Sequence, residues 1–294
     1  MLGAVARAAL FVALFLLLWS AAVVLLAPVA IWLGAPPIAM QGGTMLLAAL
    51  AAGWTLLVLA DNGLPDALGF HLDRSAIAES AVGFAIGGAM LAVAVAALWA
   101  VGGLDYVARP GGAPTEIGRA WLHGLLVLAL PAFAEEALFR GYPFQVLVRG
   151  VGAVAATLAV SALFALVHAQ NPAAERFGLL NIFLAGVLLS IAFLRTGSLW
   201  FASTLHLAWN WAMASVADLP VSGLSYLDTP GYEPVLAGPR WLTGGAFGPE
   251  GGAVGTLGFG AGLVAVWWCT REPRPGSALV LAGHAGRGKA EEQA

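Results

Sequence analysis

Apolar runs of about twenty residues recur along the chain, and they restrict its fold more than any other feature. Of the 294 residues, 60% are hydrophobic and only 10% are charged, and the mean hydropathy is +0.87. A soluble domain does not need so much apolar side chain, whereas one such run is long enough to cross a bilayer as a helix. We therefore expect an all-α, polytopic integral membrane bundle of about eight transmembrane helices.

The expected spans are distributed over the whole chain. They cover residues 8–33, 44–60, 80–101, 119–140, 151–169, 177–194, 199–217 and 251–269. An even number of spans puts both termini on one side of the membrane, and arginine and lysine are more frequent on the side that carries the termini, which predicts cytoplasmic termini. The Ala/Gly-rich composition is compatible with a bacterial cytoplasmic membrane.

We divide the chain into four parts. These are residues 1–118 with helices one to three and an interfacial segment at 61–79, residues 119–217 with helices four to seven, residues 218–270 with an extracytoplasmic loop and helix eight, and a polar C-terminal tail at 271–294. Gly83 and Gly87 in the third span are four residues apart, a spacing that favours close helix packing. The single cysteine, Cys269, excludes an intramolecular disulfide.

Charged side chains interrupt the fourth span, where Glu135, Glu136 and Arg140 lie within six residues. A charge at membrane depth costs about 2.5–3.5 kcal/mol on insertion scales, so it usually marks function. Glu136 and Arg140 are four residues apart and share a helix face, which predicts an ion pair. Glu135 then remains free to act as a general base on water. A purely structural ion-pair cluster is the alternative at this point.

Two later spans carry further polar side chains. His168 lies in the fifth span, and antiparallel packing around the 149–152 turn would bring it to the depth of Glu135. Glu135 is about 24 Å of helix away from that turn, whereas His206 is about 14 Å from the 195–198 turn, so their depths match only if the helix breaks near Gly141 or the 149–152 turn protrudes. His206 and Asn210 share a face of the seventh span and could stabilise an oxyanion. Each of these residues, taken alone, also suits interhelical hydrogen bonding.

Together and in this order, three motifs resemble the CPBP intramembrane protease family, which comprises the type II CAAX prenyl endopeptidases and the bacterial Abi, or bacteriocin-immunity, relatives. The family motifs are Glu-Glu-x-x-x-Arg, Phe-x-x-x-His and His-x-x-x-Asn. The matching residues here are Glu135, Glu136, Arg140, Phe164, His168, His206 and Asn210. The resemblance is close over residues 119–217 and extends to the flanking helices only in hydropathy.

The resemblance implies hydrolysis of a peptide bond in a membrane-associated protein or peptide. By this analogy Glu135 and His168 activate the water, with support from Glu136 and Arg140. His206 and Asn210 then form the oxyanion site. In eukaryotic and archaeal members of the family, the substrate is a prenylated CAAX protein that loses its last three residues.

No cofactor is firmly implied. Zinc is the one candidate, and Glu135, His168 and His206 would supply three ligands and leave a fourth position open. The chain has no His-Glu-x-x-His motif, and we favour a glutamate mechanism without metal. The expected partners are the lipid bilayer and the substrate. We expect no nucleic acid, since no basic patch is present, and no nucleotide, since no strand precedes the glycines at 258–262.

Two other functions use the same polar residues. The first is a non-enzymatic membrane scaffold or bacteriocin-immunity protein that binds a peptide in the same cavity. The second is a proton-coupled transporter, because intramembrane Glu and His side chains serve proton relays. Transporters often contain inverted repeats, and the chain has no second copy of Glu-Glu-x-x-x-Arg.

Overall fold

The computed structural model describes residues 2–61, 65–225 and 227–270, and the predicted tail at 271–294 lies outside them. Long helices dominate the described residues: α1 (Leu2–Trp32), α2 (Pro37–Asp61), α3 (Arg74–Ala100), α4 (Pro114–Arg140), α5 (Tyr142–Val151), α6 (Ala153–His168), α7 (Arg176–Thr196), α8 (Leu199–Trp211) and α10 (Ala253–Cys269). The short elements are η1 (Pro65–Leu68), the π-helical turn η2 (Ala212–Val216), α9 (Arg240–Thr243), η3 (Gly245–Phe247) and η4 (Pro249–Gly251). The expected all-α membrane bundle is confirmed.

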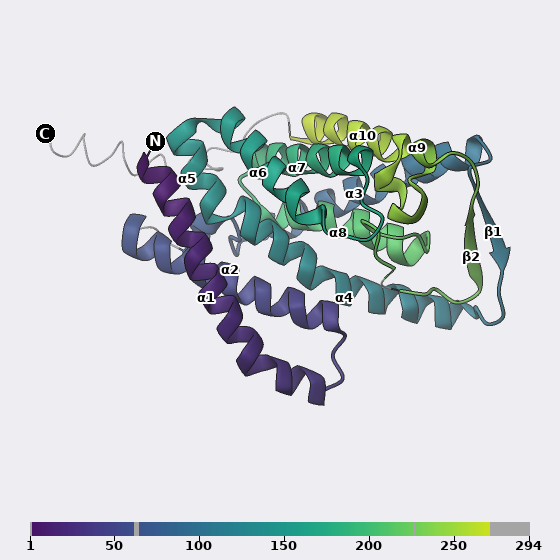
Figure 1. The fold of residues 1–294 in the computed structure, drawn as a ribbon, viewed down its shortest axis with the longest axis horizontal. Helices are drawn as coiled ribbons and strands as arrows, with labels where there is room; N and C mark the ends of the chain where they lie inside the picture. Colours follow the sequence, from purple (N-terminus) through teal and green to yellow (C-terminus); the bar gives the residue numbers. More distant parts are fainter. Residues whose placement is uncertain (1, 62–64, 226, 271–294) are drawn as a thin grey trace, which may run out of the picture.

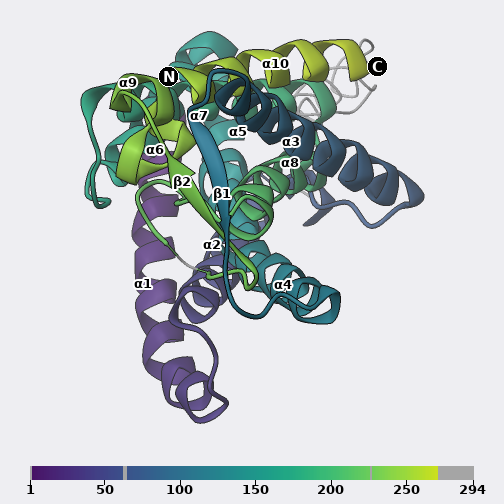
Figure 2. The same ribbon diagram turned by 90° about the vertical axis from the view of Figure 1, so that its right-hand side faces the viewer.

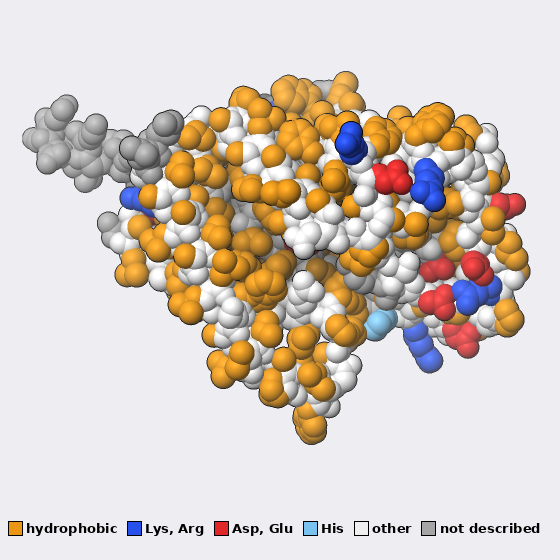
Figure 3. Space-filling view, viewed as in Figure 1, with side chains coloured by type: hydrophobic (Ala, Val, Ile, Leu, Met, Phe, Trp, Pro, Cys, Tyr) orange, Lys and Arg blue, Asp and Glu red, His pale blue; other side chains and the backbone are white. Residues whose placement is uncertain are grey.

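Five helical segments among the described residues are long and apolar enough to cross a membrane. They cover residues 3–32, 37–61, 74–100, 114–151 and 176–196, while α6 and α10 are shorter apolar helices. Figure 3 shows hydrophobic side chains over the middle of the molecule and charged side chains gathered mainly at the end that carries β1 and β2. An apolar band of this kind suits contact with lipid tails. The total of eight spans stays a prediction.

The segment expected to be interfacial, 61–79, is shorter than the sequence indicated, because α3 already begins at Arg74. The Asp73 carboxylate accepts a hydrogen bond from the backbone N–H of Ser75 and caps the helix N-terminus. The side chain of Asp61, at the end of α2, is 5% exposed and receives bonds from Arg7 of α1 and Arg149 of α5. This buried carboxylate therefore joins three helices at one end of the bundle.

A two-stranded antiparallel sheet lies at the other end, and the sequence analysis did not predict it. Strand β1 (Leu104–Ala108) pairs with β2 (Tyr232–Leu236), in a register that opposes Leu104 to Leu236. Figure 2 shows both strands crossing the face of the molecule that is turned toward the viewer. The first turns of α1 lie at the opposite end (Figure 1). The sheet therefore ties the connection before α4 to the long segment before α10.

The fourth predicted span breaks at Gly141, which is the first of the two alternatives expected from the sequence. Helix α4 ends at Arg140, and α5 begins at Tyr142 in a new direction. A Cβ atom at Gly141 would collide with the carbonyl oxygen of Ala137, so the bend needs a residue without a side chain. The break separates the charged turn of α4 from the 149–152 turn, and α6 then packs on α5 and α7. From α6, Phe164 reaches Phe139 and Arg140 of α4.

Helix α3 packs directly on the backbone of α8, which confirms the prediction from the spacing of Gly83 and Gly87. A Cβ atom at Gly83 would collide with the carbonyl oxygen of Phe201, and one at Gly87 with that of Leu205. Such close approach is typical of small residues at helix interfaces in membranes. It fixes the position of the α8 turn that carries His206.

Candidate active site

The predicted ion pair of α4 is present and fully buried. Arg140 Nη1 lies 3.2 Å from Glu136 Oε1, and neither side chain is exposed. Arg140 Nη2 donates a 3.0 Å hydrogen bond to the carbonyl oxygen of Gly186 in α7. The guanidinium carbon lies 4.7 Å from the ring centroid of Phe164, so the ring also contacts the cation. Removing water from two charges is costly, and these contacts offset part of that cost.

The same carboxylate orients His206 across the helix interface. His206 Nδ1 lies 2.9 Å from Glu136 Oε1. An ionised carboxylate only accepts hydrogen bonds, so Nδ1 carries the proton. The other ring nitrogen, Nε2, lies 3.9 Å from Glu135 Oε2. Nε2 therefore faces Glu135, and it donates a hydrogen bond only when the ring is protonated on both nitrogens.

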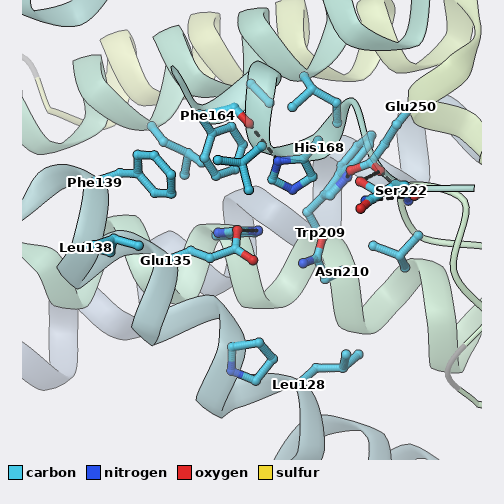
Figure 4. A pocket seen from close by; sticks show the side chains of 18 of the residues that line it. Leu128, Glu135, Leu138, Phe139, Phe164, His168, Trp209, Asn210, Ser222 and Glu250 are labelled. Carbon is cyan, nitrogen blue, oxygen red and sulfur yellow. Dashed lines mark hydrogen bonds and ion pairs between the residues drawn. The ribbon is translucent and has the colours of Figure 1, made fainter. Parts of the chain in front are cut away.

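Glu135 is the carboxylate that remains available, as the sequence predicted. It lines a cavity of about 550 Å³, and its side chain is 25% exposed. Its Oε2 atom is buried and accepts no hydrogen bond from the described residues. In Figure 4 the carboxylate points into the space between Phe139, His168 and Asn210. A carboxylate oxygen without a donor is a ready acceptor for a proton from water or a substrate.

His168 lies at the end of α6 and lines the same cavity. Its Nδ1 atom lies 2.8 Å from the carbonyl oxygen of Phe164. A carbonyl oxygen only accepts, so Nδ1 carries a proton, and Nε2 is the nitrogen that faces away from this bond. The Phe164 ring packs against His168 and lies under Arg140, so one aromatic side chain supports two of the polar groups.

Asn210 completes the set one helical turn after His206. Its side chain lines the cavity and makes no hydrogen bond with the described residues, which leaves its amide free to donate. The structure thus brings four of the six predicted site residues to one cavity. The other two, Glu136 and Arg140, lie directly behind His206 and position it.

The cavity is mainly apolar and extends well beyond these polar groups. Phe15, Trp19 and Met45, from α1 and α2, line one part of it. Val221 and Ser222, from the segment before α10, line another part. The distribution suits an extended ligand that is largely apolar and is held by a few polar contacts.

Glu250 also lines the cavity, and the sequence analysis missed it. Its side chain accepts hydrogen bonds from the indole N–H of Trp209 and from the backbone N–H and hydroxyl of Ser222. The sequence placed Glu250 in an external loop among glycines. No spacing within that loop could reveal its bond to Trp209, which lies 41 residues earlier in the chain.

No group of three or more His, Cys, Asp or Glu side chains within the described ranges is arranged to hold a metal ion. Glu135, His168 and His206 all line the cavity, but they do not form a ready ligand set for zinc in this conformation. The contact of His206 Nδ1 with Glu136 leaves Nε2 as the nitrogen that a metal ion would use.

Residues 117–212 match the family model described as type II CAAX prenyl endopeptidase, Rce1-like. The match covers about a third of the chain and includes all six predicted site residues. The resemblance suspected from the three motifs is confirmed over this region. No curated protein and no solved structure matches the chain in the corresponding comparisons.

Proposed function

We propose, from the premise that residues 117–212 carry an Rce1-like protease domain, that this integral membrane protein is an endopeptidase that uses a glutamate-activated water. Its substrate is a membrane-associated protein or peptide. The observation that carries the proposal is the Oε2 atom of Glu135, which is buried at the cavity wall, accepts no hydrogen bond from the described residues and lies 3.9 Å from His206 Nε2.

In the proposed reaction, a water molecule lies between Glu135 and Nε2 of His168. Glu135 takes a proton from the water, and the oxygen attacks the carbonyl carbon of the scissile peptide bond. The bond between carbon and nitrogen then breaks, and Glu135 returns the proton to the leaving amine. Water is consumed, and a carboxylic acid and an amine are formed, which exchange a proton to give a carboxylate and an ammonium group.

The oxygen of the tetrahedral intermediate carries negative charge and needs hydrogen-bond donors. The Asn210 amide supplies one donor, and Nε2 of His206 supplies a second when its ring is fully protonated. The Glu136–Arg140 pair keeps the His206 ring in position. This assignment gives each of the six residues a role.

A cleavage assay tests the proposal. Detergent-purified wild type and Glu135→Gln are incubated with a library of fluorogenic peptides, including lipidated ones, with and without EDTA or phenanthroline. We expect cleavage by the wild type that persists with chelator and falls at least about 100-fold in Glu135→Gln. The variant should keep its thermal stability, since Glu135 is partly exposed and outside the buried pair.

Other results of this assay would overturn the proposal. Cleavage that chelator abolishes and zinc restores would instead assign Glu135, His168 and His206 as metal ligands. Peptide binding without cleavage, unchanged in Glu135→Gln, would favour the scaffold function.

A further inference from the structure

The segment that joins η2 to α10 forms one wall of the cavity, and it lies outside the matched family region. Val221, Ser222 and Leu224 line this wall. Ser222 has a backbone φ of 48°, a left-handed value that is uncommon for residues other than glycine. A wall built on such a backbone needs specific contacts to hold it in place.

The Glu250 side chain supplies those contacts. Oε1 accepts a hydrogen bond of 2.8 Å from Trp209 Nε1. Oε2 accepts bonds of 2.7 Å from the Ser222 backbone N–H and 2.6 Å from its hydroxyl. Glu250 is only 4% exposed. All three donors are neutral, so these bonds replace the water that the buried carboxylate has lost.

The arrangement requires a carboxylate rather than an amide. The indole N–H and the backbone N–H can only donate, and they approach different oxygens of Glu250. A glutamine side chain has one accepting oxygen and one donating NH₂ group. Whichever way it turned, one N–H donor would face the NH₂ group, so Glu250→Gln breaks the arrangement with almost no change in volume.

These bonds connect the wall to both helices that carry cavity histidines. Trp209 in α8 directly precedes Asn210. The Ser222 carbonyl oxygen accepts a bond from the Asn171 amide, three residues after His168. On the other side, the amide of Asn181 in α7 donates to the backbone oxygens of Glu250 and Gly252. The wall, α6, α7 and α8 are thus held in register through Glu250 and its neighbours.

We propose that Glu250 is a positioning residue that holds the Val221–Leu224 wall against the cavity and so limits the size of the substrate side chain accepted there. The inference rests on the proposed peptidase function. It adds a specificity determinant that the matched domain does not contain. Glu250 does not touch the reacting atoms in this assignment, and it acts through Ser222 and Trp209.

The first test compares the size selectivity of wild type and Glu250→Gln. Peptides that differ only by a small or a bulky apolar residue are scanned across the positions around the scissile bond. We expect the preference for the small residue at one position, measured as a ratio of kcat/KM values, to be about tenfold lower in Glu250→Gln than in wild type. The change should lie mainly in KM. We expect kcat for the preferred peptide to change less than about threefold. An equal loss of kcat on every peptide with unchanged selectivity would overturn the proposal.

The same substitution in a Trp209→Phe variant separates the loss of the specific contact from a general loss of stability. In Trp209→Phe, the donor to Oε1 is absent, so the NH₂ group of the introduced glutamine can occupy that side without facing an N–H. Adding Glu250→Gln should therefore change selectivity much less in this background than in wild type. Additive effects of the two substitutions would overturn the assigned contact.

Chemical labelling tests the wall without any cleavage. In a Cys269→Ala background, a Leu224→Cys variant reports on access to the wall through its reaction with a water-soluble maleimide. We expect labelling to be severalfold faster after Glu250→Gln, because the wall is released. Unchanged labelling rates would overturn the proposal. If the wild type cleaved no peptide, the peptidase function would fail. Faster labelling of Leu224→Cys after Glu250→Gln would still show that Glu250 holds the wall in place.

Discussion

The Glu136 carboxylate serves two partners through a single oxygen. Its Oε1 atom accepts hydrogen bonds from Arg140 in the same helix and from His206 in α8. The pair stabilises the charge of each partner, and the second bond fixes the imidazole ring. Neighbouring Glu135 instead lines the cavity with a side chain that is 25% exposed, and no described residue donates a hydrogen bond to its Oε2 atom. Adjacent carboxylates therefore take different roles because only Glu136 is hydrogen-bonded to the buried Arg140.

Replacing Arg140 by methionine should destabilise the protein by about 3–5 kcal/mol, because Glu136 would be left buried without its cation. Thermal unfolding in detergent measures the change. Glu135→Gln is the control and should unfold within about 0.5 kcal/mol of wild type. Equal stability of Arg140→Met and wild type would mean that Glu136 does not carry a charge in the folded protein.

Replacing Asn210 by alanine should lower kcat by about 100- to 1,000-fold if its amide stabilises the oxyanion. The KM should change little, because this contact strengthens only in the transition state. Steady-state kinetics on the best peptide of the library measures both constants. A large rise in KM at constant kcat would instead make Asn210 a substrate-binding residue.

At the level of the helices, the position of the site depends on how closely α3 approaches α8. Gly87 lies against the carbonyl oxygen of Leu205, the residue before His206. Any side chain at this position would push the two helices apart. The Glu136–His206 bond spans 70 residues of sequence and depends on this packing. Small residues on α3 thus help to hold the geometry of a site to which they contribute no chemistry.

Gly87→Ala should therefore destabilise the protein by about 1–3 kcal/mol and reduce peptidase activity. Gly88→Ala is the matched control, because a Cβ atom there meets no heavy atom within 4 Å. In the control, the gain in helix propensity should leave stability unchanged or raise it by up to about 1 kcal/mol. Thermal unfolding of the two variants, side by side, decides the comparison. Equal behaviour of Gly87→Ala and Gly88→Ala would contradict the close packing.

On the scale of the whole molecule, the two ends of the bundle differ in chemistry. The end that carries Arg7, Asp61 and Arg149 is the one we expect in the cytoplasm. The β1–β2 sheet and the charges around it lie at the opposite end (Figures 1 and 3). The cavity lies between the two ends, among α4, α6, α7 and α8.

The sidedness can be measured with Cys269, which is exposed at the end of α10. A membrane-impermeant maleimide should label it in inverted vesicles and leave it unlabelled in intact cells. A Val235→Cys, Cys269→Ala variant provides the control, since Val235 in β2 is 44% exposed. It should show the reverse pattern. Labelling of both positions from the same side would contradict the predicted topology.

The sequence alone predicted those features that depend on residues close together in the chain. The helical spans follow from apolar runs longer than a bilayer requires. The Glu136–Arg140 pair follows from i, i+4 geometry, and the break at Gly141 is one of the two alternatives given by comparing the depths of Glu135 and His206. The three motifs together identified the family that matches residues 117–212. Each of these features is determined by a short stretch of chain or recognised from the three motifs together.

Only the tertiary structure decided which atoms face one another across helices. His206 turns Nδ1 toward Glu136 and Nε2 toward Glu135, although both carboxylates lie about 70 residues away. Strand β1 pairs with β2 far along the chain, with Leu104 opposite Leu236. Glu250 contacts Trp209 across 41 residues that include the irregular segment before α10. Such contacts form because packing of the whole bundle brings the groups together, and burial then favours arrangements in which most donors and acceptors have a partner. No local periodicity encodes that choice.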